Sequence, residues 1–208
     1  MIKNQPSKKT SRKKLLATLR KSLISATPVQ VQRSVEPHEV LEGVVVELGE
    51  TWVLLAGIRD GAYLNGYHAL RLQDLVRVET HATFVPLLQR RQSWPPAAPI
   101  SSLDLPEARS IITAGASLTG VVSVYREATR PGTLLIGAPV EWEEKNLWLL
   151  LITPEGRWEQ SMDKIRLKDI TQIGFGDDYE RAVLELAGPL PSRSTRHGQP
   201  ALSDTPLA

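Results

Sequence analysis

The chain has 208 residues, 41% of them hydrophobic, with 25 Lys and Arg against 23 Asp and Glu and no cysteine. This size suits one domain or two small ones. The lack of cysteine excludes disulfides and thiolate chemistry and fits a protein of the reducing cytoplasm. No run reaches the roughly 18 apolar residues of a membrane span, and no secretory signal is recognisable, so we expect a cytoplasmic protein without integral membrane association.

The charge is unevenly distributed along the chain. Residues 1–26 carry eight Lys and Arg and no acid, which leaves a net charge of −6 on residues 27–208. A leucine stripe from Leu15 to Leu23 has helical spacing, with Ser11 as a plausible N-cap and Pro28 beyond the end. We therefore predict a basic N-terminal arm and helix over 1–26. Its candidate nucleic-acid-binding residues are Lys8, Lys9, Arg12, Lys13, Lys14, Arg20 and Lys21.

Three interpretations of this arm stay open. Eight positive charges attract polyanions, because each phosphate that is neutralised releases a counterion. The same pattern suits an anionic membrane surface or a partner protein. The structural alternative is a helix whose leucine stripe docks on the body of the protein and leaves the lysines solvated.

Short β-type segments follow, separated by turn residues. We predict strands at 29–33, 41–48, 52–57, 63–72 and 75–78, with the fourth broken at Asn65-Gly66. A helix is predicted within 82–91, and Pro86 either limits it to a first turn or weakens it. Together these segments form a first unit over 27–91. Residues 92–105 are predicted to be a Pro-rich linker in which Trp94 is a candidate interface residue that could anchor on the body or on a partner.

The second half of the chain repeats this order. Within 106–187 we predict a leading helix at 106–114, strands at 120–127, 132–142, 147–153, 157–167 and 170–174, and a trailing helix from about Asp177 to Leu186. Residues 188–208 are rich in Pro, Ser and Thr and are predicted to be a disordered tail.

An internal repeat relates the two halves. At an offset of 95, the segment Leu70-Arg71-Leu72 matches Ile165-Arg166-Leu167, and the register continues to Asp74 and Asp169. Further upstream the register slips by one, so that Trp52 is expected to match Trp148. The agreement in residue type and periodicity indicates an internal duplication.

The period-2 pattern places Arg71 and Arg166 on the outer face, where they are either solvated or part of an interface. Five short antiparallel strands with one inward face most economically curl into a small barrel. We expect a mostly β protein with short helices, made of two tandem five-stranded barrels with a pseudo-twofold relation.

Each half resembles an Sm-like or SH3-like small barrel, and the stretch from Ile165 to Gly188 resembles uncharacterised bacterial proteins in which such a barrel ends in a short helix. The resemblance covers roughly 27–187 and implies a fold without a function. Sm and Hfq-type proteins read uridines with two signature loops. The loops Gln73-Asp74 and Lys168-Asp169 lack the Arg-Gly of that signature.

No catalytic, metal or cofactor site is expected. The four histidines are scattered singly, whereas zinc requires three or four converging ligands. The segment from Gly115 to Gly120 has the wrong spacing for a nucleophile elbow and is interpreted as a helix-to-strand turn. Gly174 to Asp178 lacks the third glycine of a phosphate loop, and its two acids suit a helix cap.

Two further groups have structural interpretations. Asp74 and Asp169 are conceivable as a catalytic pair, but each more simply caps the turn between the fourth and fifth strands. Four aromatic residues lie in matching strands of the two halves, and we expect them to be core residues. Acidic residues flank them, and such flanks do not suit a platform on which bases stack. These aromatics are Trp52, Tyr63, Trp148 and Trp158.

The sequence therefore predicts a non-enzymatic binding protein. The first hypothesis is a nucleic-acid-binding accessory protein, with RNA or DNA as partner, in which the basic arm supplies affinity. The alternative is a protein-interaction or scaffolding module that uses barrel edges or the cleft between the barrels. The oligomeric state is left open.

Overall fold

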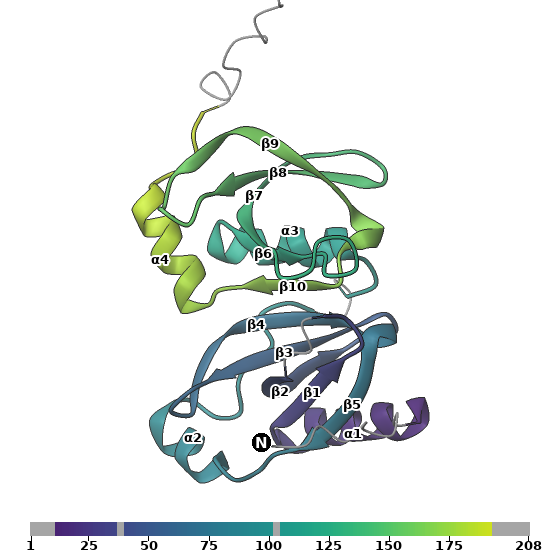
Figure 1. The fold of residues 1–208 in the computed structure, drawn as a ribbon. Coiled ribbons are helices and arrows are strands. Elements are labelled where there is room, and N and C mark those ends of the chain that lie inside the picture. Colours follow the sequence, from purple (N-terminus) through teal and green to yellow (C-terminus); the bar gives the residue numbers. More distant parts are fainter. Residues whose placement is uncertain (1–10, 37–39, 102–104, 193–208) are drawn as a thin grey trace, which may run out of the picture.

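A computed structural model describes residues 11–36, 40–101 and 105–192. Their strands form one antiparallel sheet of ten strands, accompanied by four α-helices (Figure 1). The predicted mostly β fold is confirmed. The predictions for residues 1–10 and for residues 193–208 of the tail lie outside the described residues.

The first half, residues 11–91, begins with a helix and continues with five strands and a second helix. Its elements are α1 (Arg12–Ser25), β1 (Val29–Arg33), β2 (Val40–Leu48), β3 (Trp52–Arg59), β4 (Tyr63–Arg71), the 3-10 turn η1 (Leu72–Asp74), β5 (Leu75–Thr80) and α2 (Val85–Arg91). The fourth strand continues through Asn65-Gly66, but its pairing with β3 is irregular there. Gly66 has a left-handed φ of +66° at this irregularity. The helix α2 is not limited to its first turn, because Pro86 lies within that turn, where a missing N–H costs no hydrogen bond, and the helix continues to Arg91.

The second half, residues 105–192, repeats the order of the first. Its elements are α3 (Ala108–Thr119), β6 (Val122–Tyr125), β7 (Leu134–Trp142), β8 (Asn146–Ile152), β9 (Trp158–Arg166), η3 (Leu167–Asp169), β10 (Gln172–Phe175) and α4 (Asp178–Ala187). Even the irregularities recur, since β2 is bulged between Val45 and Glu47 and β7 between Pro139 and Glu141.

The strand order in the sheet is β5-β1-β2-β3-β4-β10-β6-β7-β8-β9. In each half the last strand pairs with the first, so the five strands curl (Figure 1). The sheet is not closed, and the two separate barrels of the sequence prediction are not confirmed. The edge of β4 instead pairs with β10, in the register Leu70 to Gln172 and His68 to Gly174, so that each satisfies the other's backbone groups.

The joint between the halves is head-to-tail. The fourth strand of the first half meets the fifth strand of the second, so the two halves contribute different surfaces to the joint. The expected pseudo-twofold relation is therefore wrong, because a twofold axis would pair the same surface with itself.

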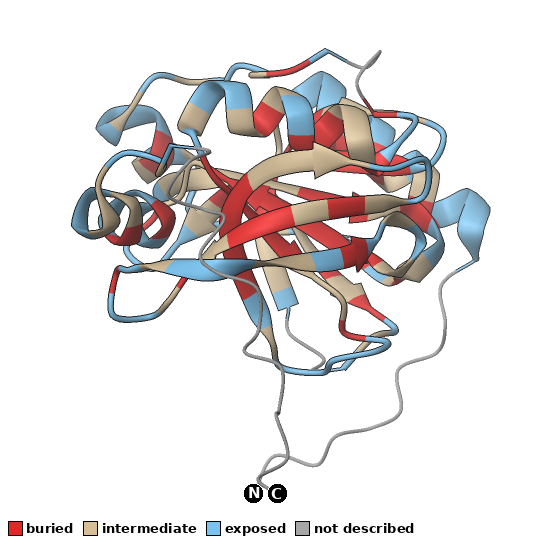
Figure 2. Ribbon diagram, turned by 90° about the horizontal axis from the view of Figure 1, so that it is seen from above, coloured by how far each residue is buried: buried red, intermediate tan, exposed pale blue. Residues whose placement is uncertain are grey.

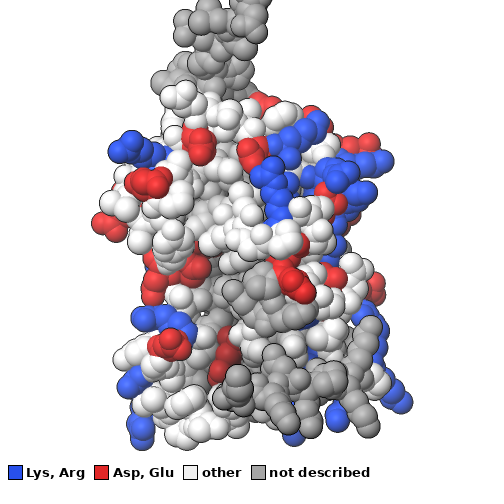
Figure 3. Space-filling model, in the orientation of Figure 1, with Lys and Arg blue, Asp and Glu red and all other residues white. Residues whose placement is uncertain are grey.

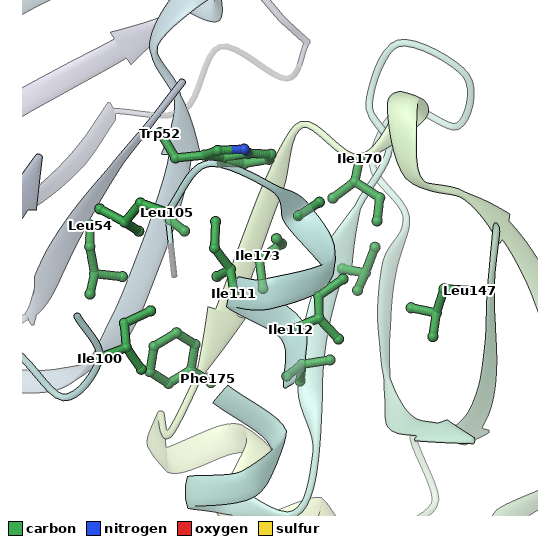
Figure 4. Close-up of a cluster of buried hydrophobic side chains, with 14 of the residues drawn as sticks. Trp52, Leu54, Ile100, Leu105, Ile111, Ile112, Leu147, Ile170, Ile173 and Phe175 are labelled. Atoms are coloured by element: carbon green, nitrogen blue, oxygen red, sulfur yellow. The ribbon is translucent and has the colours of Figure 1, made fainter. Parts of the chain in front are cut away.

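The largest hydrophobic cluster lies at the boundary between the halves. Trp52 and Leu54 of β3 converge there with Ile111 of α3 and Phe175 of β10 (Figure 4). The Pro-rich segment also contributes, since Ile100 and Leu105 are buried in the same cluster. Figure 2 shows that buried residues concentrate on the strands, whereas the helices have exposed outer sides. The halves thus share the largest cluster, and each half also has a smaller cluster of its own.

Two predicted helix ends, the start of α4 and the end of α3, differ in how well they agree with the structure. The segment before α4 is a helix cap as predicted, because Asp177 and Glu180 form a reciprocal capping box. Gly115 lies inside α3, and only Gly120 lies at its end, so the predicted turn begins later than expected.

The core positions of the aromatic residues are only partly correct. Trp52 is 2% exposed, but Tyr63 is 39% exposed, and Trp148 and Trp158 are half-buried. The register also corrects the expected match of Trp52 with Trp148. Trp52 pairs with Arg71, whereas Asn146 pairs with Arg166 and is therefore the counterpart of Trp52.

Candidate functional site in a basic cleft

A cleft of about 1020 Å³ opens where the two halves meet. The first half contributes the β2–β3 turn and the end of β4 with η1. The second half contributes the start of α3, the β7–β8 turn and the end of β9 with η3. The site therefore exists only because β4 and β10 hold the two halves side by side.

The lining of the cleft is predominantly basic. Five basic residues face two acidic ones, and they are Arg71, Arg109, Lys145, Arg166 and Lys168 against Glu107 and Glu144. Figure 3 shows Lys and Arg side chains gathered on the right of the second half, the side on which the β7–β8 turn and η3 lie in Figure 1. A surface of this sign attracts anions and raises their local concentration.

Arg71 bridges the two halves within the cleft. Its Nη2 donates hydrogen bonds to the backbone carbonyls of Leu167, at 3.3 Å, and Lys168. Its guanidinium also lies 5.5 Å from the centre of the Trp52 ring. Arg71 is thus half-buried and belongs to an interface inside the chain, one of the two alternatives that the sequence left open.

Arg166 occupies the same register position in the second half but has a different partner. Its Nε donates to Asp169 Oδ2 at 2.7 Å, and its side chain is 60% exposed. The difference arises because β4 pairs with β10, which brings η3 and its carbonyls within reach of Arg71. The strand β9, by contrast, is the last of the sheet. Arg166 therefore remains accessible to a ligand.

The sequence analysis missed three basic residues of the cleft. Arg109 lies 4.9 Å above the centre of the Trp142 ring and donates to the carbonyl of Glu143. Lys145 and Lys168 are exposed and form no ion pair with another described residue. Their positions in the β7–β8 turn and beside Asp169 were the only available signals, and neither distinguishes a site from a solvated turn.

The N-terminal helix docks on the first half. Leu15 and Leu19 of α1 are buried in a cluster with β1, β2 and β5, which agrees with the structural alternative of the sequence analysis. The basic residues of α1 are exposed, and they are Arg12, Lys13, Lys14, Arg20 and Lys21. Docking and a basic outer face thus coexist in one helix. The candidate residues Lys8 and Lys9 lie outside the described residues.

Trp94 does not line the cleft. It is half-buried in the segment after α2, and its predicted role as an interface residue stays a prediction.

Asp74 ends η1 close to the cleft. Burial raises the pKa of Asp74, and the nearby Arg71 and Arg33 oppose this shift. Its Oδ2 is buried without a hydrogen-bond partner among the described residues. Its counterpart Asp169 is instead paired with Arg166.

Among the described residues no group of three or more His, Cys, Asp and Glu is arranged to hold a metal ion. No described helix is both long and apolar enough to cross a membrane.

Comparison with known proteins finds no match to this chain among protein-family models, curated proteins or solved structures.

Proposed function

We propose that the protein binds single-stranded nucleic acid in the cleft between its halves, without catalysis. The observation that carries the proposal is the convergence of five basic side chains from both halves on one cleft. Proteins of this class combine a positive groove along the backbone with aromatic and Arg surfaces for the bases. Arg109, which lines the cleft and stacks over the Trp142 ring, supplies a surface of the second kind.

This proposal changes the role of the basic arm. The cleft becomes the main site, and α1 adds positive charge beside it as a fixed part of the first half. The repeated elements and matching bulges support the further inference that both halves are Sm-like units derived from one duplication.

The test is fluorescence anisotropy with labelled single-stranded RNA, single-stranded DNA and duplex DNA at two salt concentrations. The variant Lys145→Gln/Lys168→Gln removes two exposed charges from the cleft. We expect affinity for single strands to fall at least about tenfold and the log–log salt slope to decrease by about 1.4, since each phosphate contact contributes about 0.7.

The matched control is Arg90→Gln/Arg157→Gln. Both residues are exposed, neither lines the cleft, and the change in net charge is the same. Equal losses in the two variants would contradict a localised site. Absence of binding to any nucleic acid by the unaltered protein would reject the proposal.

A protein-interaction role is the second candidate. The outer strands β5 and β9 each have one edge that pairs with no other described strand. Such edges are templates for a strand of another chain. A complex that forms equally well with the Lys145→Gln/Lys168→Gln variant would favour this alternative.

A further inference from the structure

A second hollow lies beside the cleft on the first half. It has a volume of about 390 Å³ and is bounded by α1, the β2–β3 turn and Leu72 of η1. The two depressions share no lining residue, but the β2–β3 turn and η1 contribute to both. Glu50 of the hollow is followed in the chain by Thr51 of the cleft, and Leu72 stands between Arg71 and Gln73, which both line the cleft. The two depressions are therefore adjacent.

The hollow repeats the construction of the cleft. In the second half the cleft is bounded by the start of a helix, a β-hairpin turn and a 3-10 turn, which are α3, the β7–β8 turn and η3. The hollow is bounded by the corresponding elements of the first half, α1, the β2–β3 turn and η1. The hollow and the second-half side of the cleft are thus built from corresponding elements.

Arg12 and Arg20 make this hollow basic. They are separated by eight residues, with Leu16 midway, so all three lie on one face of α1 and line the hollow. Arg12 Nη1 donates to the Leu72 carbonyl at 3.3 Å, which holds its guanidinium beside η1. One acid, Glu50, faces these two bases.

The helix that carries these arginines is held firmly in place. Leu15 and Leu19 are buried, and Ser22 is buried between its hydrogen bond to the Thr27 carbonyl at 2.6 Å and the one that it accepts from Val45 N–H at 3.3 Å. Arg12 and Arg20 therefore project from a rigid platform, which reduces the entropy lost when they bind an anion.

We propose that a single strand bound in the cleft continues into this hollow, where Arg12 and Arg20 contact its next phosphates. This inference rests on the proposed function and narrows the ligand class to a polymer with several consecutive phosphates. A mononucleotide or a very short strand fills the cleft alone. A longer strand occupies both depressions and gains affinity from the second.

The experiment compares labelled oligonucleotides of about 4 and about 16 nucleotides, a range that spans known single-strand site sizes. The variant Arg12→Gln/Arg20→Gln removes the two charges of the hollow. We expect it to lose about tenfold in affinity for the longer strand at moderate salt and to bind the shorter strand as the unaltered protein does.

The chain offers a closely matched control. Lys13 and Lys21 have the same spacing on the same helix and are exposed, but they do not line the hollow. The variant Lys13→Gln/Lys21→Gln should bind both lengths nearly as tightly as the unaltered protein. Arg20→Gln alone keeps the Arg12 hydrogen bond to Leu72, and it should show part of the loss if the double variant is unstable.

The outcomes separate the two proposals. If the unaltered protein binds neither strand, the proposed function fails. If binding depends on Lys145 and Lys168 but the two helix variants behave alike, the cleft stands and the hollow is rejected. An equal loss for short and long strands also overturns the hollow as an extension of the site.

Discussion

Arg33 and Glu127 form a buried ion pair that ties one half of the protein to the other. Arg33 Nη2 lies 2.7 Å from Glu127 Oε1, and the two side chains are 3% and 2% exposed. Arg33 is the last residue of β1, whereas Glu127 follows β6 and also accepts a hydrogen bond from the Thr171 hydroxyl. A buried charged contact thus crosses the same boundary as the largest hydrophobic cluster.

Removing one member of this pair should be strongly destabilising. In Glu127→Gln the guanidinium of Arg33 stays buried without its counter-charge, and we expect the free energy of unfolding to fall by about 3–5 kcal/mol. Urea denaturation measures the change. The exposed pair of Arg77 and Glu79, 2.9 Å apart, is the control, and Glu79→Gln should cost less than about 1 kcal/mol. Similar costs for both variants would contradict the prediction.

Stability should also depend on the protonation of Glu180. Burial raises the pKa of Glu180 to about 7 from 4.5, and Asp177 acts in the same direction. The folded state holds this proton more tightly than the unfolded state does. The contribution of protonated Glu180 to the free energy of unfolding is therefore fully present below pH 4.5 and is lost as the pH rises to about 7. Glu180→Gln should abolish this loss, which amounts to at most about 3 kcal/mol.

The measurement is urea denaturation across this pH range for the protein and the variant. Burial lowers the pKa of His68, so the contribution of neutral His68 to the free energy of unfolding is lost as the pH falls below 6.5. This change is opposite in direction to that of Glu180. Only the difference between the protein and the variant therefore reports on Glu180. Glu185→Gln, an exposed change on the same helix, should leave the pH profile unaltered. A parallel profile for Glu180→Gln would exclude Glu180 as the titrating group.

Gly66 should tolerate no side chain. Its φ is +66°, and a Cβ there would lie 2.6 Å from the backbone nitrogen of Asp177 across the joint. Gly132 has a similar φ of +68° but nothing within 4 Å. Gly132→Ala therefore reports the backbone strain alone, about 1–2 kcal/mol, and Gly66→Ala should cost clearly more in thermal or urea unfolding. Equal costs would mean that the halves separate locally without penalty.

The N-terminal helix should be required for the stability of the first half. Leu19 is fully buried, so Leu19→Ala should cost about 2–5 kcal/mol, whereas Ile24→Ala, at a site that is 87% exposed, should cost less than about 0.5 kcal/mol. Urea denaturation distinguishes them. For the same reason, a chain starting at Thr27 loses core contacts together with charge. Substitutions of single charges are therefore the cleaner test of binding.

Local patterns in the sequence predict most elements of this fold. Alternation and turn residues located all ten strands, and the repeat around Arg71 and Arg166 placed both residues at equivalent strand ends. The pairing of β4 with β10 was missed, because it joins segments about a hundred residues apart and has no local signature. Trp52 was matched to Trp148 by residue type, whereas backbone register assigns it to Asn146.

The sequence identified only some residues of the candidate site. The repeated arginines were identified, but a cleft depends on which strand edges meet, and that is decided by packing between the halves. Arg109 lies in the predicted leading helix, and its proximity to Trp142 follows from the way α3 packs in the second half.

The segment between the halves has a consequence for how the cleft behaves at low protein concentration. Ile100 and Leu105 of this segment are buried in the shared core, so the covalent connection is itself packed against both halves. Two separate chains that met through the same strands would dissociate on dilution. Here the second half is always present at the effective concentration of a short tether, on the order of millimolar or above. The cleft therefore forms once the chain has folded, independently of how many copies of the protein a cell contains.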